Sequence, residues 1–246
     1  MKKLLLLSVV VTLFANFTMA ADKPVKKAAA PKPPRTPESA VTPEVKNPER
    51  HAKFLEITKT GDVGLLFLGD SITDGWPKKA PESWAKFAPY KVADFGIGGD
   101  RTEHVLWRIT HGELDGLKPK VTVLMIGTNN IGHFGDEKPE WAANGVKKII
   151  EVIHEKMPGT KVLLLGVFPR GAKPTDALRQ KVEAINQIIC KFDNGSNVKY
   201  LDISKKFLDD QGNLPKDIMP DSLHPNVKGY DIWYDSMWPT LAAMLK

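Results

Sequence analysis

Five short runs of aliphatic and β-branched residues recur along the chain, and most of them are continuous rather than alternating with polar residues. A continuous apolar run is typical of a strand that is buried on both faces of a parallel sheet, because each face then packs against a layer of helices. The five predicted strands span residues 63–68, 91–95, 121–126, 162–167 and 198–203.

Helical periodicity lies between these runs. Apolar residues fall on one helix face within residues 146–157 and 178–192, and again from about Val227 to Leu245, where Asn226 is the expected N-cap. Strands that alternate with helices predict an α/β fold, a three-layer α/β/α sandwich around a five-stranded parallel sheet with right-handed crossovers.

The first 48 residues differ from the rest of the chain. Two lysines precede an apolar stretch that ends in Thr18-Met19-Ala20, so residues 1–20 predict a secretory signal peptide cleaved near Ala20, and the apolar stretch is too short for a convincing membrane span. Residues 21–48 contain seven prolines and few large apolar side chains, which predicts an extended tether. Residues 49–246 are the predicted globular domain, and we expect an exported protein, periplasmic or secreted.

The positive charge is concentrated in these first residues. The net charge is +6, but residues 1–48 hold eight Lys or Arg against three Asp or Glu, so the domain is nearly neutral. This argues against a nucleic-acid partner, which needs basic charge on the folded surface. Cys190 is the only cysteine, so the domain has no internal disulfide, and we expect Cys190 to be a buried or half-buried bystander. No zinc-type spacing or nucleotide-binding loop occurs, so no metal or cofactor is expected.

Polar residues follow four of the predicted strands, at the sheet edge where ligands bind in such folds. Ser71 follows the first strand, Gly99 the second and Asn129 the third, and Asp221-Ser222-Leu223-His224 comes after the fifth. Each could be a turn by itself, since Gly, Asp, Asn and Ser are ordinary turn residues.

Together these residues provide the groups for nucleophilic catalysis. A serine hydroxyl needs a base within hydrogen-bond reach. His224 can be that base for Ser71, and Asp221 can accept from the other ring nitrogen and fix the tautomer. The backbone N–H of Ser71, that of Gly99 and the side-chain amide of Asn129 are candidates for an oxyanion hole.

Other interpretations compete for single residues. An acid near an imidazole at a helix start is common, so Asp221 and His224 alone are weak evidence. Asp70 is expected to accept a hydrogen bond that holds the turn before Ser71, and Asp100 with Glu103 suggests a cap for the following helix. Three aromatic residues either line a pocket or pack internally: Trp76, His133 and Phe134.

In order along the chain, the four motifs are Gly69-Asp70-Ser71, the Gly98-Gly99 pair, Gly127-Thr128-Asn129 and Asp221-x-x-His224. They resemble the four conserved blocks of the SGNH or GDSL hydrolase superfamily. The segments "FGIGGDRTEHVLWRI", "VLMIGTNN" and "VLLLGVFPRG" are most similar to the catalytic subunits of intracellular-type platelet-activating-factor acetylhydrolases and their bacterial relatives. The resemblance covers roughly residues 60–240.

The resemblance implies a flavodoxin-like sandwich and cofactor-free hydrolysis of small acyl esters. It also implies Ser71 as nucleophile, His224 as base, Asp221 as its partner, and Ser71, Gly99 and Asn129 as the oxyanion hole. The related acetylhydrolases pair as dimers, which leaves a homodimer open. They lack an export signal and a proline-rich tether, so their phospholipid substrate does not transfer to this chain.

We therefore expect an exported serine esterase that removes acetyl or other short acyl groups, with acetylated carbohydrate as a suitable substrate. Two alternatives stay open. One is a non-catalytic envelope- or carbohydrate-binding module on the same fold, in which the four motifs are structural. The other is a hydrolase of longer acyl chains in lipids or of thioesters, since pocket depth depends on loops at residues 131–138 and 170–174.

Overall fold

The five predicted strands form one parallel sheet in the order β2-β1-β3-β4-β5, with every neighbouring pair parallel. This order, with its reversal between β1 and β3, is that of the flavodoxin-like fold, so the predicted fold class is confirmed. The computed structural model describes residues 33–246, and residues 34–246 form one compact unit. The strands are β1 (Leu65–Gly69), β2 (Val92–Gly96), β3 (Val121–Met125), β4 (Lys161–Leu165) and β5 (Val198–Leu201).

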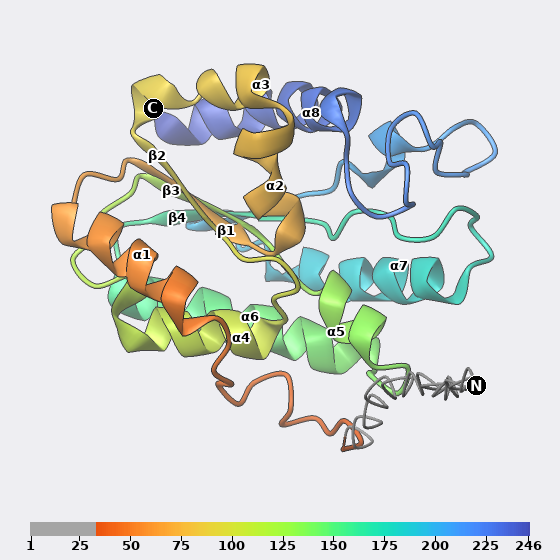
Figure 1. Cartoon of the computed structure of the whole chain (residues 1–246), viewed down its shortest axis with the longest axis horizontal. Helices are drawn as coiled ribbons and strands as arrows, with labels where there is room; N and C mark the ends of the chain where they lie inside the picture. Colours follow the sequence, from red (N-terminus) through yellow and green to blue (C-terminus); the bar gives the residue numbers. More distant parts are fainter. Residues whose placement is uncertain (1–32) are drawn as a thin grey trace, which may run out of the picture. The chain divides into compact units, whose positions relative to one another are not determined.

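Helices cover both faces of the sheet (Figure 1). One face carries α2 (Ser71–Lys79), α3 (Pro81–Ala85) and α8 (Val227–Leu245). The other face carries α1 (Pro48–Thr60), α4 (Thr102–Arg108), α5 (Thr128–His133), α6 (Pro139–Lys156) and α7 (Ala177–Ile189). Short helical turns complete the fold: η1 (Ala88–Tyr90), η2 (Ile109–Glu113), η3 (Cys190–Phe192) and η4 (Ser204–Phe207).

Alternate residues of each central strand enter two separate hydrophobic cores. In β1, Leu66 and Leu68 pack with the core under α1, α4, α6 and α7. Leu65 and Phe67 pack on the other side with Trp76 of α2 and several residues of α8. Because both faces of the strand are buried, the run has to be apolar throughout, which is why it shows no alternation in the sequence.

The predicted strand limits differ from the observed ones by one or two residues. One such change is at β5, which ends at Leu201 instead of residue 203. The Asp202 carboxylate accepts a hydrogen bond from the Ser204 N–H at 2.8 Å, and this bond starts the helical turn η4 in place of a longer strand. In α8, Asn226 caps the helix as predicted, by accepting from the Gly229 N–H at 3.1 Å, but Val227 is 56% exposed and not part of the apolar face.

Residues 34–47, called here the N-terminal strap, pack against the domain although the sequence assigned them to a tether. The Ala40 carbonyl accepts a hydrogen bond from the Thr102 hydroxyl at 2.8 Å, and Ala40 is fully buried. Arg35 forms ion pairs with Glu103 and Glu137 at 2.8 and 2.5 Å. The compact unit therefore begins at Pro34 and not at the predicted boundary of residue 49.

The remaining predictions for the N-terminus, namely the signal peptide at residues 1–20 and the tether up to residue 32, lie outside the described residues. Within the described part of the chain, none of the helices has the length and apolar character needed to cross a membrane.

Candidate active site

Ser71 is the first residue of α2, immediately after β1 and the capping residue Asp70. The Asp70 carboxylate is buried and accepts a hydrogen bond from the Ile72 N–H at 2.9 Å, so Asp70 holds the turn as the sequence predicted. A Cβ on Gly69 would lie 2.2 Å from the Thr73 hydroxyl and 2.7 Å from the Met125 carbonyl. Only glycine lets the first turn of α2 pack this closely against the strand ends.

His224 is held in a tight turn before α8. One oxygen of Asp221 accepts from the backbone N–H groups of Leu223 and His224 at 3.1 and 2.7 Å, and Ser222 has a left-handed conformation with φ of 58°. The other carboxylate oxygen contacts the Nδ1 atom of His224 at 2.6 Å. The side chain of Asp221 thus shapes the turn and also faces the imidazole ring.

The turn brings the imidazole to the nucleophile candidate. His224 Nε2 lies 2.9 Å from the Oγ atom of Ser71, across 153 positions of sequence. Burial opposes ionisation of Asp221, but its hydrogen bonds from His224 outweigh it and hold the Asp221 pKa below the ordinary value. The residues that the sequence proposed as nucleophile, base and acid therefore lie in one continuous chain of hydrogen-bond contacts.

The loop at residues 98–100 passes beside Ser71. A Cβ on Gly98 would lie 3.9 Å from the Ser71 Cβ, and Gly99 has a φ of 74°, a conformation that favours glycine. The buried Asn129 donates from Nδ2 to the Asp100 carbonyl at 2.9 Å. An amide nitrogen carries two hydrogens, and this bond uses one of them.

Arg108 organises this edge of the sheet, and sequence reasoning did not find it. Its buried guanidinium donates to the carbonyls of Gly69 and Phe95, at the ends of β1 and β2, at 3.1 and 2.7 Å. It also binds the carboxylates of Asp100, at 3.0 Å, and Glu113. In the sequence, Arg108 cannot be told apart from a solvent-exposed arginine on a helix. Only the structure shows that the side chain is buried with four buried acceptors.

The start of α4 differs from the predicted cap. Arg101 is the N-cap residue, and its backbone N–H donates to the ring of His104 at 3.0 Å. Asp100 instead pairs with Arg108, while Glu103 pairs with Arg101 at 2.5 Å. The acids predicted to cap the helix are used as buried partners of arginine.

A cavity of about 400 Å³ adjoins His224 and Asp221. Lys79 of α2 lines it together with Pro220, Pro225, Asn226 and Val227. Of the three aromatic candidates, Trp76 is fully buried and stacks against the Tyr230 ring, so it belongs to the core. The His133 ring lies 3.7 Å from the Cβ position of Gly99 and is therefore close to the loop at residues 98–100.

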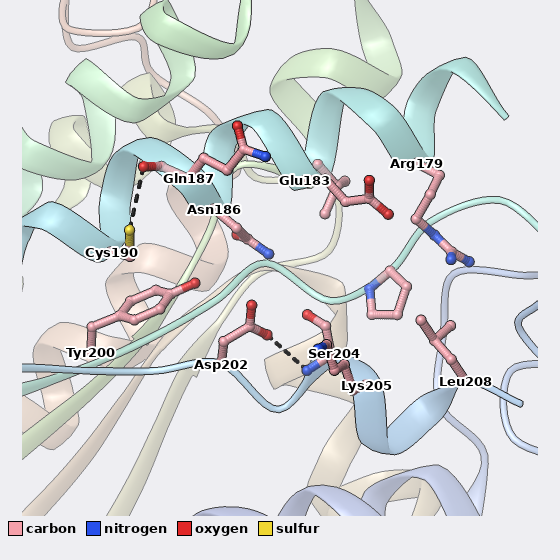
Figure 2. Close-up of a pocket in the computed structure, with 12 residues that line it drawn as sticks. Arg179, Glu183, Asn186, Gln187, Cys190, Tyr200, Asp202, Ser204, Lys205 and Leu208 are labelled. Atoms are coloured by element: carbon pink, nitrogen blue, oxygen red, sulfur yellow. Dashed lines mark hydrogen bonds between the residues drawn. The ribbon is translucent and has the colours of Figure 1, made fainter. Parts of the chain in front are cut away.

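A second cavity, of about 440 Å³, is lined by residues of α7, β5 and η4, and none of Ser71, Asp221 and His224 lines it (Figure 2). Its buried Arg179 donates to the carbonyls of Gly171 and Gly212, so this side chain supports two loops. Cys190 also lines the cavity and is exposed, with Sγ 3.3 Å from the Gln187 carbonyl, so the prediction of a buried or half-buried cysteine was wrong.

Comparison with known proteins identifies the family. Residues 67–232 match the model of the GDSL-like lipase/acylhydrolase family. The chain belongs to this family. It is 38% identical over 183 residues to the platelet-activating factor acetylhydrolase IB subunit alpha2 of Rattus norvegicus, an alignment that covers 74% of the chain and 77% of the relative. The resemblance stated from the sequence motifs is thereby confirmed.

Two solved structures support the fold of this hydrolase. A GDSL-like lipase from Bacteroides thetaiotaomicron superposes with a TM-score of 0.67 and 21% identity over 80% of this chain and 98% of the other. An acetyl xylan esterase superposes with a TM-score of 0.61 and 21% identity over 72% and 98%. At these identities the match establishes a shared architecture, while the sequence relatives establish that the protein is a GDSL acylhydrolase.

Proposed function

We propose that this GDSL hydrolase is a serine esterase that removes acetyl or other short acyl groups through an acyl-enzyme formed on Ser71. The observation that carries the proposal is the 2.9 Å contact between Ser71 Oγ and His224 Nε2, with His224 Nδ1 held by Asp221 at 2.6 Å. A serine hydroxyl is a weak nucleophile without such a base.

In the first half-reaction, Ser71 Oγ attacks the ester carbonyl carbon while His224 Nε2 takes the hydroxyl proton. The carboxylate of Asp221 stabilises the resulting imidazolium and keeps Nδ1 protonated. The tetrahedral intermediate then breaks the bond to the alcohol oxygen, and His224 returns the proton to that oxygen. In the second half-reaction His224 activates water, which releases the acid and restores Ser71.

The oxyanion of the intermediate needs donors that are already in place. The N–H of Ser71 is one of the first in α2, and such groups have no acceptor within their own helix. The N–H of Gly99 and the amide of Asn129 are the further candidates. A donor of this kind contributes about 10²–10³-fold to turnover in serine hydrolases.

One observation favours a short acyl group. The rat relative and the acetyl xylan esterase are both named for acetyl chemistry. A separate feature concerns the alcohol: a cavity of about 400 Å³ adjoins His224 and Asp221, and we propose that it receives the alcohol part of the ester. We propose that the substrate is an acetylated carbohydrate, in which the carbohydrate is the alcohol part of the ester.

The function is tested with p-nitrophenyl esters from acetate to octanoate and with acetylated xylan as the carbohydrate probe. Turnover should be highest with acetate, and Ser71→Ala and His224→Ala should each lose about 10³-fold or more. A fluorophosphonate should label Ser71. Wild-type turnover by a folded Ser71→Ala variant would show the assignment to be wrong. Xylan binding without labelling would indicate a binding module, and a maximum at octanoate a longer-chain hydrolase.

We also propose that the protein is exported. The proposal rests on the lysines and apolar stretch of residues 1–20. Expression of the full chain in a bacterial host, followed by N-terminal sequencing of the periplasmic fraction, should yield a protein that begins at Ala21. An intact N-terminus in the cytoplasmic fraction alone would contradict export and would leave the esterase proposal unaffected.

A further inference from the structure

The N-terminal strap reaches the loop that contains Gly99. The Nζ atom of Lys46 donates to the Gly98 carbonyl at 2.7 Å and contacts the Asp100 carboxylate at 3.3 Å. These two groups flank Gly99 on either side, and the Cβ position of Gly99 itself is 3.0 Å from Nζ. Lys46 lies outside residues 67–232, the region that matches the family. It therefore binds, from outside that region, both neighbours of Gly99, a candidate donor of the oxyanion hole.

The position of Lys46 is fixed by the rest of the strap. The Glu44 N–H donates to the Glu103 carbonyl at 3.1 Å, and the Glu44 carboxylate pairs with Arg101 at 2.9 Å. On the other side, Asn47 has a left-handed φ of 48° and caps α1 by accepting from the Arg50 N–H at 3.2 Å. The backbone before and after Lys46 is thus anchored, which reduces the entropy lost when its long side chain is ordered.

The loop is held from three directions. Asn129 holds the Asp100 carbonyl, Arg108 holds one Asp100 carboxylate oxygen at 3.0 Å, and Lys46 holds the other oxygen together with the Gly98 carbonyl. Asp100 is fully buried and already has Arg108 as a charge partner. Among residues 33–246, Lys46 is the one side chain that donates to the Gly98 carbonyl. This carbonyl belongs to the peptide group whose N–H is on Gly99. Binding this carbonyl orients that N–H.

We propose that Lys46 is a positioning residue of this hydrolase. By holding the Gly98 carbonyl, it orients the Gly98–Gly99 peptide so that the Gly99 N–H points at the developing oxyanion. The inference rests on the proposed function, because it assumes that an oxyanion forms beside Ser71. Preorganised donors stabilise a transition state more than a bound substrate, so the loss of Lys46 should lower kcat while KM changes little.

The test compares Lys46→Met, which keeps the side-chain length without donor or charge, with Lys59→Met as control. Lys59 is 69% exposed on α1, and in the described part of the chain its ion-pair partner is the exposed Glu56. Lys46→Met should lower kcat for p-nitrophenyl acetate by about tenfold or more, with KM within about twofold, and should slow fluorophosphonate labelling of Ser71 by a similar factor. Lys46→Arg retains donors and charge and should recover most of both rates.

Circular dichroism and thermal unfolding establish that each variant is folded, and labelling rates are expressed per folded molecule. Unchanged kcat and labelling in Lys46→Met, an equal loss in Lys59→Met, or a loss confined to KM would overturn the inference while the esterase proposal stands. A wild-type protein that neither hydrolyses esters nor labels at Ser71 would remove both proposals together.

Discussion

The carboxylate of Asp221 holds His224 at two points, with one oxygen 2.6 Å from ring Nδ1 and the other 2.7 Å from the backbone N–H. The same group therefore orients the imidazole and shapes the turn that presents it. These two roles can be separated, because an amide oxygen can replace the acceptor of the backbone N–H but cannot reproduce the negative charge beside Nδ1.

Asp221→Asn should lower kcat by about 10³-fold, because the ring loses its anionic acceptor, while the midpoint of thermal unfolding stays near that of the wild type. Asp221→Ala should lose activity to a similar extent and should also unfold at a lower temperature, since the turn loses its acceptor. Steady-state kinetics and thermal scans measure both. An active Asp221→Asn variant would contradict the assigned role.

Gly99 and Gly61 provide a matched pair of substitutions. Both have a left-handed φ, of 74° and 65°, and a Cβ on Gly61 meets no atom within 4 Å. Each change to alanine should destabilise the protein by about 1–2 kcal/mol through backbone strain. Only Gly99→Ala should also lower kcat, by about tenfold or more, because its Cβ presses on Lys46 and shifts the loop. Equal kcat values for the two variants would argue against a Gly99 N–H in the oxyanion hole.

Arg108→Met should be among the most destabilising single changes in the protein. It leaves the buried carboxylates of Asp100 and Glu113 without this cation, a situation that typically costs about 3–5 kcal/mol. Arg50→Met is the control, because the ion pair of Arg50 with Asp74 is partly solvated and should contribute less than about 1 kcal/mol. Urea denaturation measures both, and similar midpoints for the two variants would contradict the organising role of Arg108.

Stability should depend on pH through Asp70. Burial raises the pKa of this carboxyl from its usual value near 3.8 to about 7. Between about pH 4 and pH 7 the folded state therefore keeps a proton on Asp70 that the unfolded state has lost. The stability that Asp70 contributes through this proton is fully present below about pH 4 and is lost as the pH rises through 7. The free energy of unfolding should therefore fall between pH 5 and pH 8, as urea titrations at constant ionic strength can show.

Asp70→Asn should flatten this slope and should retain the cap, because the amide oxygen still accepts from the Ile72 N–H. Burial also raises the pKa of Asp94 to about 7, so the difference between wild type and variant isolates the Asp70 contribution. Asp62→Asn, at a side chain that is 62% exposed, is the matched control for an Asp-to-Asn change at the surface. If the free energy of unfolding of Asp70→Asn fell with pH as steeply as that of the wild type, Asp70 would not be the source of this pH dependence.

Several elements escaped prediction because their signals are not local. Helix α1 buries only His51, Phe54 and Thr58, so it has no strong apolar stripe. The strap is rich in proline and charge, and the partners that Arg35, Glu44 and Lys46 find lie far along the chain. The exposure of Cys190 follows from its place in the turn after α7, which its helical spacing did not reveal.

The sequence by itself determined the class of fold, because strands buried on both faces have to be apolar throughout and their alternation with helices requires a parallel sheet. It also indicated that Ser71, Gly99, Asn129 and the Asp221–His224 turn lie at one edge, since the carboxyl ends of parallel strands meet there. Only the tertiary structure decided the order of the strands, the burial of Arg108 and the docking of Lys46 beside Gly99. Those features depend on contacts between residues that are far apart in the chain. Such contacts produce no periodic pattern in the local sequence, so the sequence alone does not predict them.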